Sequence, residues 1–348
     1  MSGFKPPINQ EQPIRILHTL LKNRTLPHAF LFTGTKGVGK QAAAVALSMA
    51  CNCLGENSGL KAEDRAKQDT ESVSVKSDLA ALESCGVCKS CRKIESGNHA
   101  DIIRIQPSGA FIKIAQIRAL VHTLTMKPYE AKIRVVVICD AQALNAAASN
   151  ALLKILEEPP DRTMLVLIAT HRSALLPTIV SRCQHIGFNP ISKKNMAVFL
   201  SEEHGIAPEA AKIISAMANG SFSRAQAMIR HNWLKRREWL LGEINVLSLQ
   251  KMSRLFALAE KLSREKEMLS EMLEVIKVWF RDLIIAQYDP EKIINQDVAD
   301  MLKIESEKTS IASLLSKFDA VQQTQNHIIA NTNLRLTMEG LLINLAQP

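Results

Sequence analysis

The chain has 348 residues with a formal net charge of +9, and 47% of them are hydrophobic but only 4% are aromatic. A chain of this length is long enough for two or three domains with sizeable cores, and the scarcity of aromatic side chains argues against a base-stacking platform for single-stranded nucleic acid. The sequence shows no apolar run of membrane-spanning length and no signal-peptide core at its start, so we expect a cytoplasmic protein whose mild positive charge permits nucleic-acid contact without requiring it.

The first predicted elements are a helix, a strand and a second helix, with a glycine-rich loop between the last two. Leucine and isoleucine recur at three-to-four spacing over residues 11–26, which predicts a helix. The apolar run 29–32 predicts a buried strand, and the alanine-rich run 41–50 predicts a helix. A strand, a glycine loop and a helix in this order are the setting of a phosphate-binding loop, so residues 34–41 predict a nucleotide cradle.

This loop supplies most of the groups that hold phosphate but lacks one metal contact. Gly34, Gly37 and Gly39 allow backbone N–H groups to turn toward phosphate oxygens, and Lys40 adds a full positive charge. The residue after the lysine normally supplies a Ser or Thr hydroxyl to Mg²⁺, and here it is Gln41. The loop could still hold phosphate without a metal, so ATP binding stays open while Mg²⁺ is not expected.

A group of cysteines predicts a zinc site. Cys85, Cys88 and Cys91 are separated by two residues each, which brings three sulfurs to one point. Tetrahedral zinc needs a fourth ligand, which Cys53 or Cys51 can supply across the intervening segment, because the cost of loop closure grows slowly with length. Four cysteine ligands leave no open coordination position, so we expect a structural zinc.

Two other interpretations of these cysteines are weaker. Three unrelated buried thiols would rarely show this spacing, and the bacterial iron–sulfur pattern would continue with Cys-Pro where this chain has Glu95 and Ser96. The residues between the two parts of the site, 55–78, are rich in charged and small polar side chains, so they predict a flexible insertion.

A second metal contact is missing further along the chain. Residues 102–105 and 135–138 predict strands, and 114–124 predict a helix between them. A P-loop ATPase places an acidic pair after the second of these strands, and its first carboxylate helps to hold Mg²⁺. Here that position is Cys139. Because two coupled magnesium contacts, at Cys139 and Gln41, are absent together, we expect that ATP hydrolysis has been lost.

The rest of the chain changes from alternating strands and helices to helices alone. Residues 144–157 predict a helix that Pro159 stops, and 164–169 predict another buried strand of an α/β domain. Beyond Pro190 the predicted helices cover residues 193–203, 208–218, 221–230 and most of 234–345. One apolar stripe there predicts core packing and not a cofactor site; it consists of Met272, Val275, Trp279, Leu283 and Ala286.

The ordered motifs of the chain resemble a known family. They are the segments 26–29, 34–41, 99–101, 150–160, 181–183, 220–225 and 333–342, together with the cysteines. This set is similar to the AAA+ clamp-loader subunits of bacterial DNA polymerase III, and among them to the delta prime type. The resemblance covers about residues 9–228 and a closing helix, and it departs from the ATP-hydrolysing members at Gln41 and Cys139.

The resemblance implies three domains. An AAA+ P-loop domain, with a parallel sheet and helices on both faces, would occupy residues 1–188 and contain a zinc module at 53–91. A small helical lid would follow at 189–240. An all-helical collar at 241–348 would then pack with the collars of other subunits.

The resemblance also implies a function and roles for single residues. A delta prime subunit joins gamma or tau and delta subunits and helps them to load the sliding clamp onto primed DNA during replication, without hydrolysing ATP itself. Arg182 matches the arginine finger that such a subunit offers to a neighbouring gamma or tau ATP site, and Arg224 matches the lid arginine of the chain's own site. Cys53 matches the fourth zinc ligand better than Cys51 does.

Three alternatives stay open. Arg182 could form a purely local ion pair with a carboxylate. The chain could be an active gamma-like clamp-loader ATPase, which Gln41 and Cys139 argue against. It could also be a stand-alone DNA-binding protein with a structural zinc, for which the sequence shows no concentrated basic patch.

Overall fold

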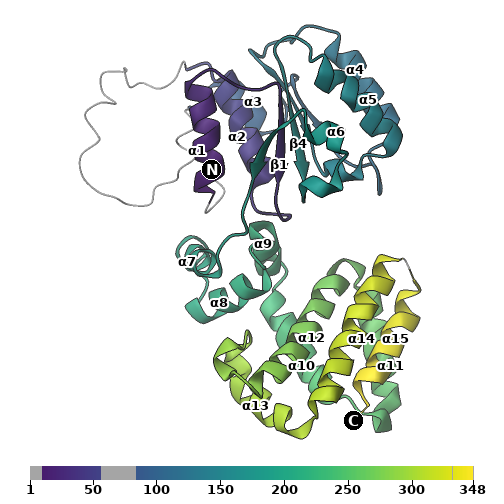
Figure 1. The fold of residues 1–348 in the computed structure, drawn as a ribbon. Coiled ribbons are helices and arrows are strands. Elements are labelled where there is room, and N and C mark those ends of the chain that lie inside the picture. The colour runs from purple at the N-terminus through teal and green to yellow at the C-terminus, as the bar shows by residue number, and fades with distance from the viewer. Residues whose placement is uncertain (1–9, 56–83, 331, 348) are drawn as a thin grey trace, which may run out of the picture. The chain divides into compact units, whose positions relative to one another are not determined.

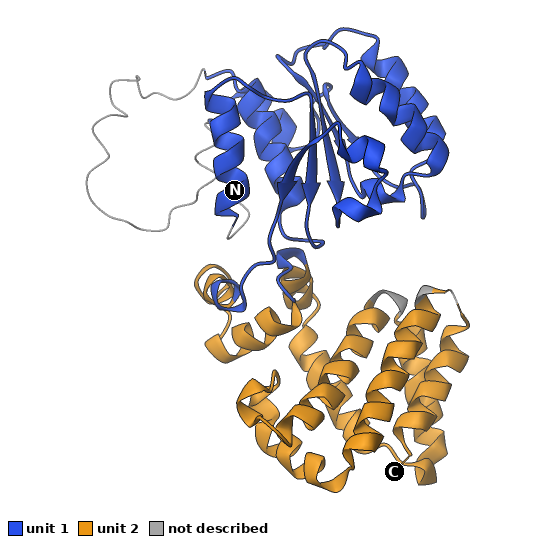
Figure 2. Ribbon diagram, viewed as in Figure 1, with its two compact units in different colours: residues 1–196, 219–223 blue, residues 197–218, 224–348 orange. Residues whose placement is uncertain are grey.

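The computed structural model describes residues 10–55, 84–330 and 332–347 of the chain. It divides into two compact units, of which the first comprises Met1–Met196 with Asn219–Ser223 and the second comprises Ala197–Ala218 with Arg224–Pro348 (Figure 2). The predicted flexible insertion at 55–78 lies outside the described residues, except for Gly55.

Among the described residues, the first unit is built on a five-stranded parallel sheet with the strand order β2-β3-β4-β1-β5. Its strands are β1 (Ala29–Thr33), β2 (Ile102–Ile105), β3 (Arg134–Ile138), β4 (Thr163–Ala169) and β5 (Gln184–Gly187). Strands β1, β3 and β4 are buried along their whole length, as their continuous apolar runs predict. The predicted parallel sheet is confirmed. The sequence pattern does not predict β5, because Ile186 is the only buried residue in that strand.

Helices cover both faces of this sheet (Figure 1). Alternate residues of β1 point to opposite faces, so that Phe30 and Phe32 join one buried cluster while Ala29 and Leu31 join the other. One face carries α1 (Glu11–Lys22) and α2 (Lys40–Asn52), with α3 (Lys89–Glu95) packed on α2, and the other carries α4 (Ile114–Leu124), α5 (Ala146–Glu157) and α6 (Pro177–Val180). Each fully buried Leu or Phe side chain contributes about 1.5–3 kcal/mol, so the two apolar clusters hold the helices on the sheet.

Several helix boundaries differ from the sequence prediction by one to four residues, among them the end of α1 and the start of α5. Helix α1 ends at Lys22 and not at residue 26. Helix α5 begins at Ala146 and not at residue 144, because Asn145 caps it. The Asn145 side chain accepts a hydrogen bond from the backbone N–H of Ala148 at 2.8 Å, which satisfies one of the free donors at the helix start.

Within the described residues the second unit is all-helical, which confirms the predicted helical region. Its helices are α7 (Lys193–His204), α8 (Pro208–Met217), α9 (Phe222–Arg230), α10 (Trp233–Asn245), α11 (Met252–Arg264), α12 (Lys266–Ala286), α13 (Ala299–Lys308), α14 (Ile311–Ile329) and α15 (Leu334–Leu345), of which α7 and α9 begin in segments of the first unit. Helices α10, α13 and α14 pack on α12, and α15 packs on α11 and α14. The stripe predicted as core on α12 is buried at each of its positions.

The helical region bears on two further expectations. The predicted border between lid and collar, at residue 240, falls within α10. The division into three domains therefore stays a prediction.

In the part of the chain that the structure describes, no helix has the length and apolar composition needed to cross a membrane.

A buried polar network joins α10 and α12 to the segment that follows α12. The guanidinium of Arg237 is buried and donates to the side chain of Asn295 and, through two bonds of 2.8 Å, to Asp297. The carboxylate of Asp282 is buried and accepts the backbone N–H groups of Ile294 and Asn295 at 3.0 and 2.8 Å. Burial raises the pKa of Asp282, although these donors oppose the rise.

Candidate functional site

The glycine loop has the backbone that a phosphate-binding loop needs. Gly34, Gly37 and Gly39 have φ angles of 143°, 82° and 101°, which residues with a side chain rarely adopt. A Cβ atom at Gly34 would lie 2.4 Å from the carbonyl oxygen of Phe188, and one at Gly37 would lie 2.2 Å from the hydroxyl oxygen of Ser221. Gly34 is therefore required for space as well as for conformation, and Gly37 is favoured chiefly by its φ angle.

The lysine of the loop is held by the loop itself. The Lys40 ammonium donates to the carbonyl oxygen of Thr35 at 2.7 Å and also to that of Gly34. Lys40 is only 6% exposed, and its burial lowers its pKa to about 8, while Asp140 raises it and Lys36 lowers it further. In this arrangement, the Lys40 ammonium donates to carbonyl groups of the loop itself, although it is the group that would bind a phosphate oxygen.

Gln41 and Cys139, the two residues at the predicted magnesium-contact positions, lie in contact with each other. The side-chain N–H of Gln41 donates to the Cys139 sulfur at 3.1 Å, although the two residues are 98 positions apart in the chain. Cys139 is buried at the end of β3, and burial raises the pKa of its thiol while the Gln41 contact lowers it. A neutral thiol and an amide N–H are poor partners for Mg²⁺, which prefers oxygen ligands. The missing magnesium contacts stay a prediction from the sequence, and the structure shows that Gln41 and Cys139 contact each other.

The start of α9 covers part of the same loop. The carbonyl oxygen of Gly37 accepts the backbone N–H groups of Phe222 and Ser223 at 3.0 and 3.3 Å. Arg224, the predicted lid arginine, follows in the first turn of α9 and is half-buried. The loop thus contacts the segment that leads to the predicted arginine.

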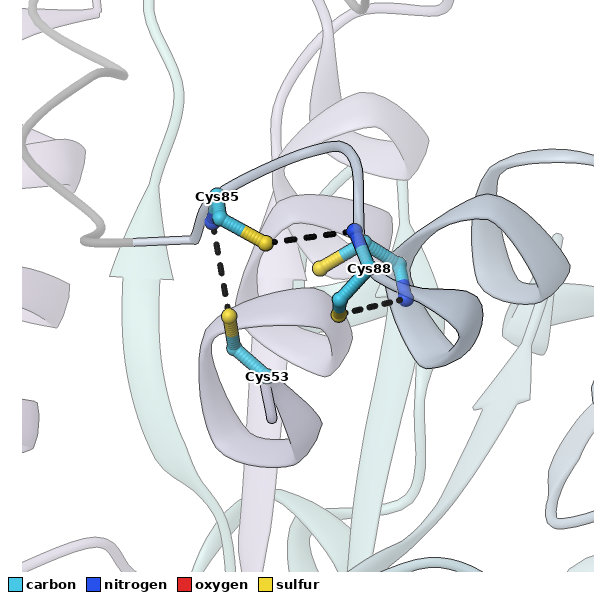
Figure 3. Close-up of side chains that lie close together, drawn as sticks. Cys53, Cys85 and Cys88 are labelled. Carbon is cyan, nitrogen blue, oxygen red and sulfur yellow. Dashed lines mark hydrogen bonds between the residues drawn. The ribbon is translucent and has the colours of Figure 1, made fainter. Parts of the chain in front are cut away.

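The structure brings four of the predicted zinc ligands together (Figure 3). The sulfur atoms of Cys53, Cys85, Cys88 and Cys91 all lie within 4.8 Å of one another. Tetrahedral zinc with Zn–S bonds of about 2.3 Å places its sulfurs ~3.8 Å apart, so the group needs only a small contraction to hold the metal. Cys51 lies on α2 and packs against the sheet-side apolar cluster instead, where burial raises its pKa to about 12.

Backbone N–H groups point at the sulfur atoms. The N–H of Cys85 donates to the sulfur of Cys53 at 3.4 Å, that of Cys88 to Cys85 at 3.3 Å, and that of Cys91 to Cys88 at 3.5 Å. Burial opposes ionisation of Cys88, but N–H donors from Cys91 and Leu54 outweigh it and lower its pKa to about 6. Burial and the neighbouring thiols raise the pKa of Cys91. The four cysteines could therefore hold a structural zinc, because the surroundings already stabilise a thiolate.

The cysteine group is fastened to the sheet by polar contacts. The Asn52 side chain donates to the carbonyl oxygen of Ile133 at 2.9 Å and accepts its N–H at 3.0 Å. The Lys132 ammonium donates to the carbonyl oxygen of Cys53 at 2.7 Å. These bonds connect the end of α2, which carries Cys53, to the segment that leads into β3.

A buried ion pair supports the loop between α4 and β3, and sequence reasoning missed it. The carboxylate of Asp101 accepts backbone N–H groups of the loop at 2.9, 2.8 and 2.9 Å; the donors are Tyr129, Glu130 and Ala131. It also pairs with Arg134 at 3.4 Å, and both side chains are about 5% exposed or less. Arg134 in turn donates to the carbonyl oxygens of Thr123 in the last turn of α4 and of Met126 and Lys127 in the loop. The only sequence signal was Asp101 itself, within the 99–101 motif.

The predicted arginine finger forms a local ion pair. The Arg182 guanidinium lies 2.8 Å from a carboxylate oxygen of Glu157 and donates to the carbonyl oxygen of Thr178 at 2.9 Å and to the hydroxyl of Ser181 at 3.4 Å. Its side chain is 36% exposed. The local pairing weighed from the sequence therefore exists, but a guanidinium has five N–H donors, so these contacts do not exhaust it.

Comparison with known proteins assigns the family. A family model of the DNA polymerase III delta subunit matches residues 9–76 and 66–192, and a model of its C-terminal part matches 231–347. The DNA polymerase III subunit delta' of Bacillus subtilis is 29% identical over 98% of this chain and 98% of that protein. The chain belongs to the delta prime family of DNA polymerase III clamp-loader subunits. The delta' subunit of Pseudomonas aeruginosa is likewise 29% identical, over 92% of each chain.

Delta prime is related to another subunit type of the polymerase. The tau subunit of Escherichia coli is 30% identical over 65% of this chain, which spans 32% of tau. Among solved structures, a gamma subunit-related protein from Thermotoga maritima aligns with 95% of this chain and 98% of its own, with 18% identity and a TM-score of 0.42. The sequence identity with tau makes this delta prime chain a clamp-loader subunit related to tau.

Proposed function

We infer that the chain works as a non-hydrolysing delta prime subunit, bound to gamma or tau and to delta, which helps to load the sliding clamp onto primed DNA. The observation that carries this proposal is the contact between Gln41 and Cys139. An ATPase of this type needs a hydroxyl and a carboxylate at these positions to hold Mg²⁺. In this chain the amide of Gln41 donates to the thiol of Cys139 instead, so the chain's own site would lack the metal contacts that hydrolysis requires.

Arg182 is the residue through which the chain would act on a neighbour. An arginine finger stabilises the charge that develops on the transferred phosphoryl group and is worth roughly 10³ to 10⁵ in rate in related NTPases. Support comes from the partial exposure of Arg182 and from its place in the 181–183 motif. Its local contacts leave N–H donors for a phosphate from outside the chain.

The other parts of the proposal concern architecture. The four-cysteine group would hold one structural zinc, since four sulfur ligands leave no position for substrate. Residues 189–240 would form the lid and 241–348 the collar that joins the other subunits. Chromosome replication places such a subunit in the bacterial cytoplasm.

The test is ATP turnover with Mg²⁺, measured for the purified chain alone and for its mixture with gamma or tau and delta subunits. We expect no turnover by the chain alone and DNA-stimulated turnover by the mixture. Arg182→Ala should strongly reduce the turnover of the mixture without reducing assembly. Arg15 is an exposed arginine on α1, and Arg15→Ala should leave turnover unchanged. Unchanged turnover with Arg182→Ala would refute the finger. Turnover by the chain alone, abolished by Lys40→Ala, would instead favour a gamma-like ATPase.

A further inference from the structure

Two motifs that lie apart in the sequence meet in the folded chain. Glu157 belongs to the 150–160 motif at the end of α5, and Arg182 belongs to the 181–183 motif after α6. Their side chains form an ion pair at 2.8 Å. We propose that Glu157 is a positioning residue for Arg182, which holds the guanidinium in the orientation that a phosphate on a neighbouring subunit requires. This inference rests on the proposed role of Arg182.

The backbones that carry the two side chains are firmly anchored. Helices α5 and α6 pack on each other, and Leu156 and Ile179 are buried in the same apolar cluster of the sheet. Cys183, next to Arg182, packs on that cluster too. Pro159 and Pro160 follow one residue after the end of α5 and prevent the helix from continuing. Because both backbones are anchored, the ion pair restricts the direction in which the Arg182 side chain points, in addition to bringing two opposite charges together.

Local helix chemistry does not explain a glutamate at this position. Glu157 is the last residue of α5, where the helix dipole favours a cation and disfavours a carboxylate. The ion pair with Arg182 adds little folding stability to offset this unfavourable position, because Glu157 and Arg182 are 50% and 36% exposed and exposed ion pairs stabilise a fold only weakly. A role in orienting Arg182 accounts for both facts.

The contact geometry suits this role. The guanidinium is planar, and acceptors on two of its nitrogen atoms determine the orientation of the plane. One nitrogen contacts Glu157 and the other donates to the carbonyl oxygen of Thr178, which is a fixed backbone atom. Without the Glu157 carboxylate, the long side chain of Arg182 would be held only through Thr178 and Ser181. The entropy cost of ordering that side chain would then add to the activation barrier of phosphoryl transfer.

The experiment measures DNA-stimulated ATP turnover by the full chain reconstituted with gamma or tau and delta subunits. We expect Glu157→Gln to lower kcat about two- to fivefold, the range that one exposed charged contact supports, with the KM for ATP unchanged. The amount of complex on gel filtration should also stay the same. The matched control is Glu158→Gln, which removes the same charge from the adjacent exposed residue and should leave kcat unchanged.

The double variant separates this inference from the proposed function. If Glu157 acts through Arg182, Glu157→Gln should lower turnover no further in a chain that already carries Arg182→Ala. A loss of turnover with Arg182→Ala but not with Glu157→Gln would overturn the positioning role and leave the finger intact. Equal losses with Glu157→Gln and Glu158→Gln, or reduced assembly with Glu157→Gln, would also overturn it. No effect of Arg182→Ala would overturn both.

Discussion

Replacing Asp101 with asparagine tests how the loop between α4 and β3 is held. The Asp101 carboxylate is 3% exposed, accepts three backbone N–H groups at 2.8 to 2.9 Å and faces the guanidinium of Arg134. Asparagine keeps one acceptor oxygen but places an N–H₂ group where the second oxygen accepts. The substitution therefore removes hydrogen bonds and leaves the buried charge of Arg134 without its counter-charge.

We expect this change to lower the free energy of unfolding of the first unit by about 3–5 kcal/mol, which is the usual cost of removing one partner of a buried ion pair. That is a large share of the 5–15 kcal/mol that typically stabilises a domain. The expected loss follows from the unpaired Arg134 and from backbone donors that lose their acceptor.

The effect should depend on pH in a defined direction. Burial opposes ionisation of Asp101, but the backbone N–H groups and Arg134 outweigh it and lower its pKa below the usual value of 3.8. A carboxyl with a lowered pKa stabilises the fold above its unfolded pKa, and this stabilisation is lost as pH falls through the folded pKa. The difference between wild type and Asp101→Asn should thus be constant from about pH 8 to 5 and should shrink below about pH 4.

Urea unfolding followed by two probes measures this loss. All three tryptophans, Trp233, Trp239 and Trp279, lie in the second unit, so their fluorescence reports that unit alone. Asp101→Asn should move the far-UV circular dichroism transition of the first unit down by about 1–3 M urea and leave the fluorescence transition in place. The control is Asp161→Asn, an exposed aspartate, which should shift neither. A circular dichroism transition that Asp101→Asn does not move, or a loss that is as large at pH 3 as at pH 7, would refute the reasoning.

Three further predictions follow from the other sites. Cys88→Ser should remove about one zinc per chain in metal analysis and lower the Tm of the first unit, while Cys51→Ser should keep the metal; retention of zinc by Cys88→Ser would contradict the four-ligand site. Gln41→Thr combined with Cys139→Asp should restore Mg²⁺-dependent binding of a fluorescent ATP analogue, and either change alone should not; strong Mg²⁺-dependent binding by the wild type would contradict the reasoning. Arg237→Met should shift the tryptophan transition to lower urea by an amount that corresponds to about 1–3 kcal/mol, because the buried side chain of Asn295 loses its donor; bound metal should not change, and no shift would show that the buried network is dispensable.

The sequence by itself predicted the features that depend on short stretches of chain. Continuous apolar runs marked β1, β3 and β4, because a strand buried on both faces needs apolar side chains at every position. The spacing of Cys85, Cys88 and Cys91 predicted a common point for their sulfurs, since residues this close cannot lie far apart. The absence of a hydroxyl at Gln41 and of a carboxylate at Cys139 could also be recognised from residue types alone.

The tertiary structure decided which distant residues meet. Cys53 joins the cysteine group and Cys51 does not, because Cys51 lies within α2 on the side that packs toward the sheet while Cys53 follows the helix end. Strand β5 forms because β1 offers it a hydrogen-bonding edge, although its own residues show little apolar pattern. The pairs Asp101–Arg134 and Glu157–Arg182 depend on the paths of separate segments across the sheet, and no local pattern encodes such paths.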